Sequence, residues 1–278
     1  MNNWELRAQA WSRLQPPLRP SPADCAFIAR WIDRYHAGMP AHAAGLRVLI
    51  LGATPEYHAL PWPAHTRLLA ADVSSTMLDQ VWPGPRATTL CRDWLTLPPD
   101  PEGFDLVLGD GSLSQLRWPD QHTAMTTVLH GLLKPGGLLL LRMFVRESGH
   151  EDFDTVLREW QATPASNVDA AKLRLWLACQ RNAVEGVSPP EFWRQLAARI
   201  PDVSHLARLL GTSIDAARRI TDEYLHMEQL RFHFVPETDL MRLFCGDGRY
   251  QLVERYVPDY PLGQYCPSVA LRTTAAGA

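Results

Sequence analysis

Five short aliphatic runs within residues 46–146 constrain the fold more than any other feature of the sequence. In chain order they are LRVLIL, TRLLAAD, ATTLCRD, FDLVLGD and GLLLLRMF, and stretches of helical or loop pattern separate them. Apolar runs that alternate with helical segments are typical of strands buried on both faces of a parallel sheet. The pattern therefore predicts an α/β fold made of repeated strand–helix units.

The segments on either side of these runs have different patterns. Residues 1–45 are predicted to be a helical flank or lid, because the proline-rich stretch QPPLRPSP interrupts two helical segments. Residues 147–233 contain several amphipathic segments and no convincing strand, which predicts a helical insertion after the fifth strand. The last part returns to strands, YQLVERYVP and SVALRTT, which suit an antiparallel pair. The predicted core thus comprises residues 46–146 and 234–278, and residues 147–233 form a cap.

Composition narrows the range of partners and compartments. The 278 residues are 46% hydrophobic with a net charge of −3, and no Lys/Arg-rich run forms a basic stripe, which argues against nucleic acid as a partner. The five cysteines are scattered, with no spacing typical of a zinc site or a disulfide framework. The N-terminus lacks the pattern of a signal peptide, and no window approaches the roughly 18 apolar residues of a membrane span. We expect a cytoplasmic protein that contacts neither membrane nor nucleic acid.

Acidic residues recur at the ends of the predicted strands. Asp72 follows Gly52 by 20 residues, Asp93 follows Asp72 by 21, and Asp110 follows Asp93 by 17. Ligands of open α/β sheets bind outside the carboxyl ends of the strands, where an acidic residue about 20 positions after the first glycine turn meets ribose hydroxyls. Asp72 fits that role, whereas any one of these residues alone is equally compatible with helix capping.

The turn after the first strand departs from a dinucleotide-binding fingerprint. Gly52 is followed by Ala53, Thr54, Pro55 and Glu56, where that fingerprint has further glycines so that a pyrophosphate can approach the backbone. Pro55 lacks an N–H donor, and Glu56 would place negative charge beside a diphosphate. A ligand that carries a cationic group and no phosphate suits this turn better.

The motifs VLILGATPE, AADVSSTMLDQ, CRDWLTLP, FDLVLGDGSLSQL and LLKPGGLLLLRMF resemble, in that order and spacing, those of the class I S-adenosylmethionine-dependent methyltransferases. The resemblance covers about residues 46–146. It implies a Rossmann-like, doubly wound, mostly parallel sheet of seven strands, with a helical insertion after strand five and a C-terminal antiparallel pair. It also implies S-adenosylmethionine as the cofactor, which carries a sulfonium and no phosphate.

The resemblance further implies a cofactor site at the strand ends. Asp72 would accept hydrogen bonds from the ribose, Met77 would pack on the adenine, and Asp93 would receive the adenine amino group. Arg13 or Arg19 is a candidate partner for the methionine carboxylate. The expected cofactor-binding residues are Gly52, Ala53, Thr54, Pro55, Asp72, Val73, Met77, Asp93, Trp94, Asp110, Gly111, Ser112 and Arg19.

Evidence for the acceptor is weaker. The fourth strand ends in GDGSLSQL, not in the Asn/Asp-Pro-Pro-Tyr/Phe signature of families that methylate nucleic-acid bases, which favours a small-molecule acceptor methylated on oxygen or nitrogen. The candidate catalytic residues are Asp110, His122, Arg142 and His233. Arg142 could meet an acidic substrate or pair with the insertion. Trp176 and Phe232 could wall the acceptor pocket, although aromatics at helical spacing are more often core.

Other functions remain open on the sequence alone. A non-catalytic cofactor sensor or partner subunit would carry the same strand-end motifs, and an aminopropyltransferase would use a related fold. The latter would need additional carboxylates for a polyamine, whereas Gly111 follows Asp110. No histidine pair has metal-ligand spacing, so no metal is expected. The helical insertion is equally suited to cap a pocket or to form a homodimer interface.

Overall fold

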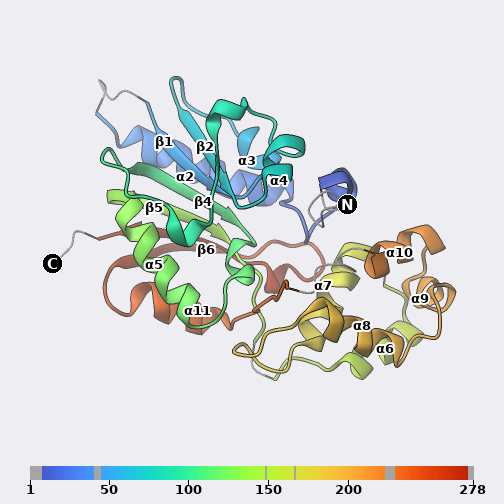
Figure 1. Ribbon diagram of the computed structural model, residues 1–278. Coiled ribbons are helices and arrows are strands. Elements are labelled where there is room, and N and C mark those ends of the chain that lie inside the picture. Colours follow the sequence, from blue (N-terminus) through green and yellow to red (C-terminus); the bar gives the residue numbers. More distant parts are fainter. Residues whose placement is uncertain (1–7, 41–44, 148, 166, 223–228, 275–278) are drawn as a thin grey trace.

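One seven-stranded sheet forms the centre of the molecule. The computed structural model describes residues 8–40, 45–147, 149–165, 167–222 and 229–274 (Figure 1). The strand order is β3-β2-β1-β4-β5-β7-β6, in which β7 runs antiparallel to both neighbours and the other pairs are parallel. The strands are β1 (Arg47–Leu51), β2 (Arg67–Asp72), β3 (Thr89–Cys91), β4 (Phe104–Asp110), β5 (Leu133–Arg142), β6 (Tyr250–Tyr256) and β7 (Ser268–Thr273). The predicted fold class is confirmed.

Alternating side chains of the central strands bury both faces of the sheet. In β1, Val48 and Ile50 belong to one hydrophobic cluster, whereas Leu49 and Leu51 belong to another on the opposite face. The first cluster includes side chains of α2 (Pro22–Ala37), α3 (Pro55–His58) and α4 (Ser75–Gln80). The second includes side chains of α5 (Asp120–Leu132) and α11 (Glu237–Cys245). Helices on both faces give the doubly wound architecture.

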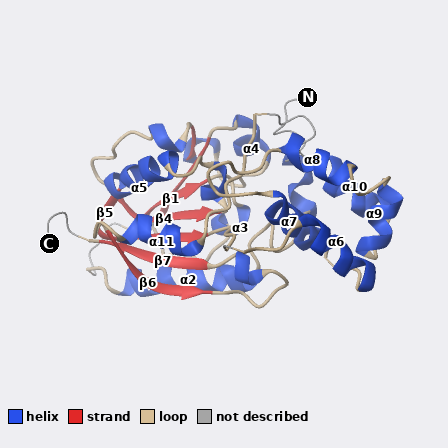
Figure 2. Cartoon of the chain, turned by 90° about the horizontal axis from the view of Figure 1, so that it is seen from below, coloured by secondary structure: helices blue, strands red, loops and turns tan. Residues whose placement is uncertain are grey.

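Five helices form a separate lobe beside the carboxyl ends of the parallel strands (Figure 2). They have a hydrophobic cluster of their own, which includes Phe153, Trp176 and Phe192. The five are α6 (Phe153–Ala162), α7 (Val168–Cys179), α8 (Pro189–Ala197), α9 (Val203–Leu210) and α10 (Ile214–Asp222). All of them lie within the stretch that was predicted to be an insertion, and we call them the helical lobe.

An N-terminal strap, residues 8–21, connects the helical lobe to the sheet. The backbone N–H of Gln15 donates to Asp169 at 2.8 Å, and the Asn167 amide donates to the carbonyl of Pro16 at 3.0 Å. On the sheet side, Arg142 donates to the carbonyl of Pro17 at 2.7 Å. After the strap, Ser21 begins α2 with a capping box. Residues 1–7 and 41–44 of the predicted flank lie outside the described residues.

Membrane-spanning segments are not found among the helices that the structure describes, since none of these is both long and apolar enough to cross a bilayer.

Candidate functional site

A cavity of about 270 Å³ opens at the carboxyl ends of the parallel strands. Residues at and after the carboxyl ends of β1, β2, β3 and β4 form one side, and the strap, the helical lobe and the segments that hold Phe144, Phe232 and Phe234 form the other. The first side contributes Leu51, Gly52, Ala53, Thr54, Asp72, Val73, Met77, Asp93, Trp94, Leu95, Asp110, Gly111, Ser114, Gln115, Leu116 and Gln121. The second contributes Trp11, Leu18, Phe144, Lys172, Leu173, Trp176, Phe232 and Phe234.

The turn after β1 depends on Gly52. Its φ of 94° lies in the left-handed region that side-chain-bearing residues rarely adopt, and its N–H donates to the carbonyl of Ala71 at 2.7 Å. Ala53 and Thr54 then line the cavity, and α3 begins at Pro55, where a missing N–H leaves no helix bond unmade. Pro55 itself does not line the cavity.

Asp72 ends β2 beside this turn and is only 8% exposed. One carboxylate oxygen accepts from the N–H of Ser74 at 2.8 Å, and the backbone of Ala53 provides a further hydrogen bond. Burial disfavours the ionised form more than these bonds favour it, which raises the pKa of Asp72 to about 6. A carboxylate held in this way is ionised at neutral pH, and Asp72 lines the cavity.

This raised pKa predicts a pH dependence of ligand binding. If the ionised Asp72 accepts ribose hydroxyls, protonation below pH 6 removes an acceptor, so affinity must fall as the pH is lowered through that value. Between about pH 7.5 and pH 5, the dissociation constant of S-adenosylhomocysteine is expected to rise about tenfold. Titration calorimetry at both pH values measures the change, and Asp72→Asn, which cannot titrate, should show a flat profile. A flat profile in the unmodified protein would contradict the assignment.

Residues that follow β3 also line the cavity. β3 ends at Cys91, two residues earlier than the predicted strand, and Asp93 is exposed and accepts from the N–H of Leu95 at 2.9 Å. The Trp94 indole donates to the carbonyl of Ala71 at 2.6 Å, which holds its ring beside the glycine turn after β1. Met77, in α4, is buried and also lines the cavity. These predicted adenine-binding residues therefore line the same cavity.

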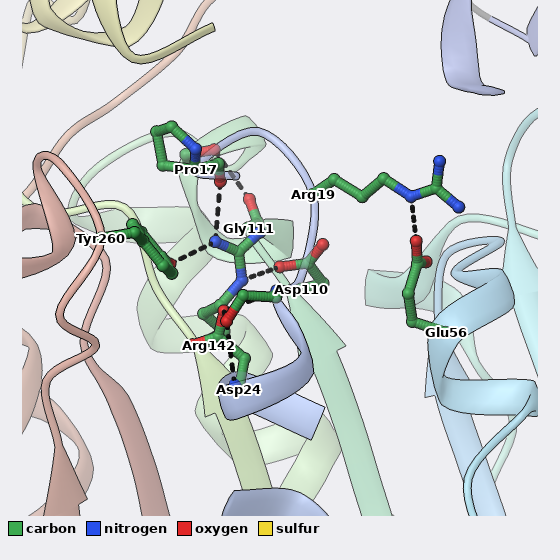
Figure 3. A network of polar contacts seen from close by, with 10 residues as sticks. Pro17, Arg19, Asp24, Glu56, Asp110, Gly111, Arg142 and Tyr260 are labelled. Atoms are coloured by element: carbon green, nitrogen blue, oxygen red, sulfur yellow. Dashed lines mark hydrogen bonds and ion pairs between the residues drawn. The ribbon is translucent and has the colours of Figure 1, made fainter. Parts of the chain in front are cut away.

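The structure corrects the role predicted for Arg142. Its guanidinium is fully buried and donates to Asp110 at 2.6 Å, to the carbonyl of Pro17, and to the Tyr260 hydroxyl at 3.1 Å (Figure 3). Burial opposes its charge, but Asp110 outweighs burial and holds the pKa of Arg142 well above its usual range. Arg142 does not line the cavity, and the ion pair that it forms is with Asp110 and not with the insertion. Asp110 lines the cavity and is the counter-ion of this arginine.

Arg19 and Ser112 were predicted to contact the cofactor, and neither lines the cavity. Arg19 forms an ion pair with Glu56 (Figure 3), so its charge is neutralised at the start of α3. Ser112 is buried, and its hydroxyl lies close to the backbone of Gly109. Sequence spacing placed Ser112 near the cavity but could not give the direction of its side chain.

The histidines proposed as bases also lie outside the cavity. His122, in α5, is buried against Trp118, and burial lowers its pKa to about 4. His233 is buried, contacts the carbonyl of Ala183 at 2.8 Å through its Nδ1, and likewise has a pKa lowered by burial. Both are therefore neutral structural residues at physiological pH. The sequence could not distinguish these cases, because a histidine near the edge of a sheet can point into the core as readily as into a pocket.

The residues on the lobe side of the cavity were largely missed. Trp176 and Phe232 were weighed as pocket walls, with core as the favoured alternative, yet both line the cavity as well as packing in the lobe. Trp11 and Leu18 reach it from the strap. Lys172 precedes Trp176 by one helical turn, so the two residues lie on the same face of α7. That spacing was the one sequence signal that could have identified Lys172 as a residue of the cavity wall.

The strap contacts predict that the N-terminus contributes to binding. Deleting residues 1–20 removes Trp11 and Leu18 from the wall, and lost apolar contact of this size should weaken S-adenosylhomocysteine binding by about 1 kcal/mol or more. Calorimetry gives the affinity, and circular dichroism reports whether the remainder stays folded. Leu18→Ala is the companion variant because it keeps the Pro17 carbonyl that Arg142 requires. Unchanged affinity in both variants would contradict a role for the strap.

Comparison with known proteins supports the architecture. No protein-family model matches the sequence, and no curated protein does. Among solved structures, a candidate zinc-dependent alcohol dehydrogenase from Rhodobacter sphaeroides aligns with 99% of this chain and 100% of its own, at TM-score 0.54 and 16% identity. A candidate O-methyltransferase from Nostoc punctiforme aligns with 97% of this chain and 60% of its own, at TM-score 0.50 and 12% identity.

The antiparallel strand β7, inserted between β5 and β6, completes the sheet expected from the sequence motifs. The chain has the fold of the class I methyltransferases. The N-methyltransferase NodS from Bradyrhizobium japonicum, solved with S-adenosylhomocysteine, aligns over 99% of this chain and 100% of its own at 13% identity and TM-score 0.49. At these identities the likeness concerns the methyltransferase fold alone. Within the described ranges, no group of three or more His, Cys, Asp or Glu side chains is placed to hold a metal ion.

Proposed function

We propose that this protein is an S-adenosylmethionine-dependent methyltransferase that acts on a small-molecule acceptor. The observation that carries the proposal is the buried carboxylate of Asp72 at the end of β2, beside the Gly52 turn and in one cavity with Met77 and Asp93. These residues come from three successive strand–helix units, so the fold itself brings them together.

The cavity suits a nucleoside that carries no phosphate. Its three carboxylates, Asp72, Asp93 and Asp110, can accept hydrogen bonds and attract positive charge but would repel a diphosphate. The short helix α3 begins at Pro55, which has no N–H to offer a phosphate, and Glu56 in its first turn is paired with Arg19. These acidic, hydrogen-bond-accepting groups therefore fit S-adenosylmethionine better than a dinucleotide.

Each group has a role in holding this cofactor. Asp72 accepts the ribose hydroxyls, Asp93 accepts the adenine amino group, Met77 packs on the base, and the Gly52 turn meets the methionine part. S-adenosylmethionine supplies an electrophilic methyl group on a sulfonium. The protein's task is then to orient the acceptor and exclude water, and the strap and helical lobe cover the strand ends for that purpose.

Methyl transfer can be tested directly. Purified protein is incubated with methyl-labelled S-adenosylmethionine and a size-fractionated cell extract, and label is followed by chromatography. We expect label in the small-molecule fraction, and its loss with Asp72→Ala. Cofactor binding without transfer to any fraction would instead support the sensor or partner-subunit alternative. Label in the nucleic-acid or protein fraction would contradict a small-molecule acceptor.

A further inference from the structure

The N-terminal strap contacts both sides of the cavity. Leu18 lines the cavity and packs against the hydrophobic cluster of the helical lobe. The next residue, Arg19, pairs with Glu56 at the start of α3, directly after the turn at Gly52 (Figure 3). The strap therefore bridges the two sides between which a ligand has to lie.

The cavity is small for what it has to hold. Its volume of about 270 Å³ is slightly below the roughly 300–1,000 Å³ that is typical of pockets for one small ligand. A methyltransferase has to hold a nucleoside cofactor and an acceptor in the same site at the same time. The structure therefore shows a closed conformation, which has to widen before both ligands fit.

The helical lobe is attached to the sheet in a way that suits movement as a unit. Its helices share a hydrophobic cluster of their own and lie beside the carboxyl ends of the parallel strands (Figure 2). The chain leaves the sheet for the lobe after Val145 and returns at Val235, and these two buried residues form a β-bridge. Both connections thus pass through one place, which is the arrangement of a hinge.

Two hydrogen bonds between the strap and the lobe form what we call the clasp. The backbone N–H of Gln15 donates to Asp169 at 2.8 Å, and the Asn167 amide donates to the carbonyl of Pro16 at 3.0 Å. Both lobe residues are fixed from within the lobe, because the Asn167 side chain caps α7 and Arg219 pairs with Asp169 at 2.6 Å. Single hydrogen bonds contribute little net free energy, so the clasp can break without unfolding the strap or the lobe.

Resting on the methyltransferase function proposed above, we infer that the clasp is a gate that opens whenever a ligand enters or leaves the cavity. The lobe moves about the hinge at Val145 and Val235, the two hydrogen bonds of the clasp break, and the cavity widens. Arg142 donates to the carbonyl of Pro17 and keeps the strap on the sheet while the lobe moves. Closure restores the wall around the ligands and excludes water from the site of methyl transfer.

Asn167→Ser in the full-length protein tests the gate. Serine caps a helix as well as asparagine does, so α7 keeps its first turn, but the shorter side chain loses the contact with the carbonyl of Pro16. Stopped-flow tryptophan fluorescence measures the association and dissociation rate constants of S-adenosylhomocysteine. We expect both rate constants to rise about fivefold, the factor that corresponds to a net hydrogen-bond contribution of about 1 kcal/mol. Because the clasp closes the cavity both with and without ligand, the dissociation constant should change little.

Two further variants complete the test. Asn182→Ser is the matched control, because Asn182 bonds to Glu185 within the lobe, and it should change neither rate constant. Gln15→Pro removes the N–H that donates to Asp169 and leaves the lobe unchanged. It should raise both rate constants as Asn167→Ser does, and it gives the result even if Asn167→Ser fails to fold.

The rate constants separate a gate from a purely structural contact. An association rate constant that stays unchanged in the clasp variants would overturn the gate, including the case in which dissociation alone becomes faster, as loss of a simple contact would produce. Failure of S-adenosylhomocysteine to bind the unmodified protein would overturn the proposed function and the gate with it.

Discussion

Replacing Arg142 with methionine is expected to lower the free energy of unfolding by about 3–5 kcal/mol. The change leaves the carboxylate of Asp110 buried without its counter-ion, and an uncompensated buried charge is among the most destabilising single changes. It also leaves the carbonyl of Pro17 and the hydroxyl of Tyr260 without a donor from Arg142. Urea unfolding followed by tryptophan fluorescence measures the loss.

The double variant Asp110→Asn with Arg142→Met is the control for this interpretation. Removing both charges should be clearly less destabilising than the sum of the two single changes, because no buried ion is then left unpaired. Arg255→Met, which breaks a partly exposed ion pair with Glu237, should cost at most about 1 kcal/mol. A loss below about 1 kcal/mol for Arg142→Met would contradict the interpretation that the buried pair stabilises the fold.

Removing the helical lobe is expected to abolish methyl transfer. A variant that lacks residues 151–228, closed by a short flexible linker, loses Lys172, Leu173 and Trp176 from the cavity but keeps every residue assigned to the nucleoside. We expect transfer to fall by at least about 100-fold, because the acceptor is no longer oriented or shielded from water, while S-adenosylhomocysteine affinity changes less than tenfold.

Two measurements separate a cap from a dimer interface. Light scattering gives the mass per particle, from which the number of chains per particle follows. If the lobe is a cap, that number should be the same before and after the deletion. In the intact protein, hydrogen exchange should be faster in the lobe than in the sheet and should slow when an acceptor analogue joins S-adenosylhomocysteine. A deletion variant that turns from dimer to monomer yet still methylates would establish the interface instead.

The sheet could be predicted because its pattern is local. The central parallel strands are apolar runs, as expected for strands buried on both faces. Successive side chains such as Val48 and Leu49 point to opposite faces of the sheet, and both are apolar. Gly52 and Asp72 could be assigned because a strand end fixes which edge of the sheet a residue occupies. Ten of the thirteen predicted cofactor-binding residues therefore line the cavity.

The remaining errors concern side-chain direction and partners distant in sequence. Arg142 pairs with Asp110, 32 positions away, through the neighbouring strand, and no local pattern identifies that partner. Arg19 was predicted to contact the cofactor, but it pairs with Glu56, which lies 37 positions away in the sequence. Trp176 could not be separated from a core residue, since a helix that lines a cavity has the same apolar spacing as one that packs in a core. The contacts that tie the strap to the lobe are likewise non-local.

The most direct test of this account is the affinity of S-adenosylhomocysteine for the unmodified protein and for Asp72→Ala, measured by titration calorimetry at neutral pH. We predict saturable binding of one ligand per chain, weakened by on the order of 2 kcal/mol in the variant, because charge-assisted hydrogen bonds to the ribose are lost. Circular dichroism would verify that Asp72→Ala is folded. Absence of binding to the unmodified protein, or equal affinity in a folded variant, would contradict the account.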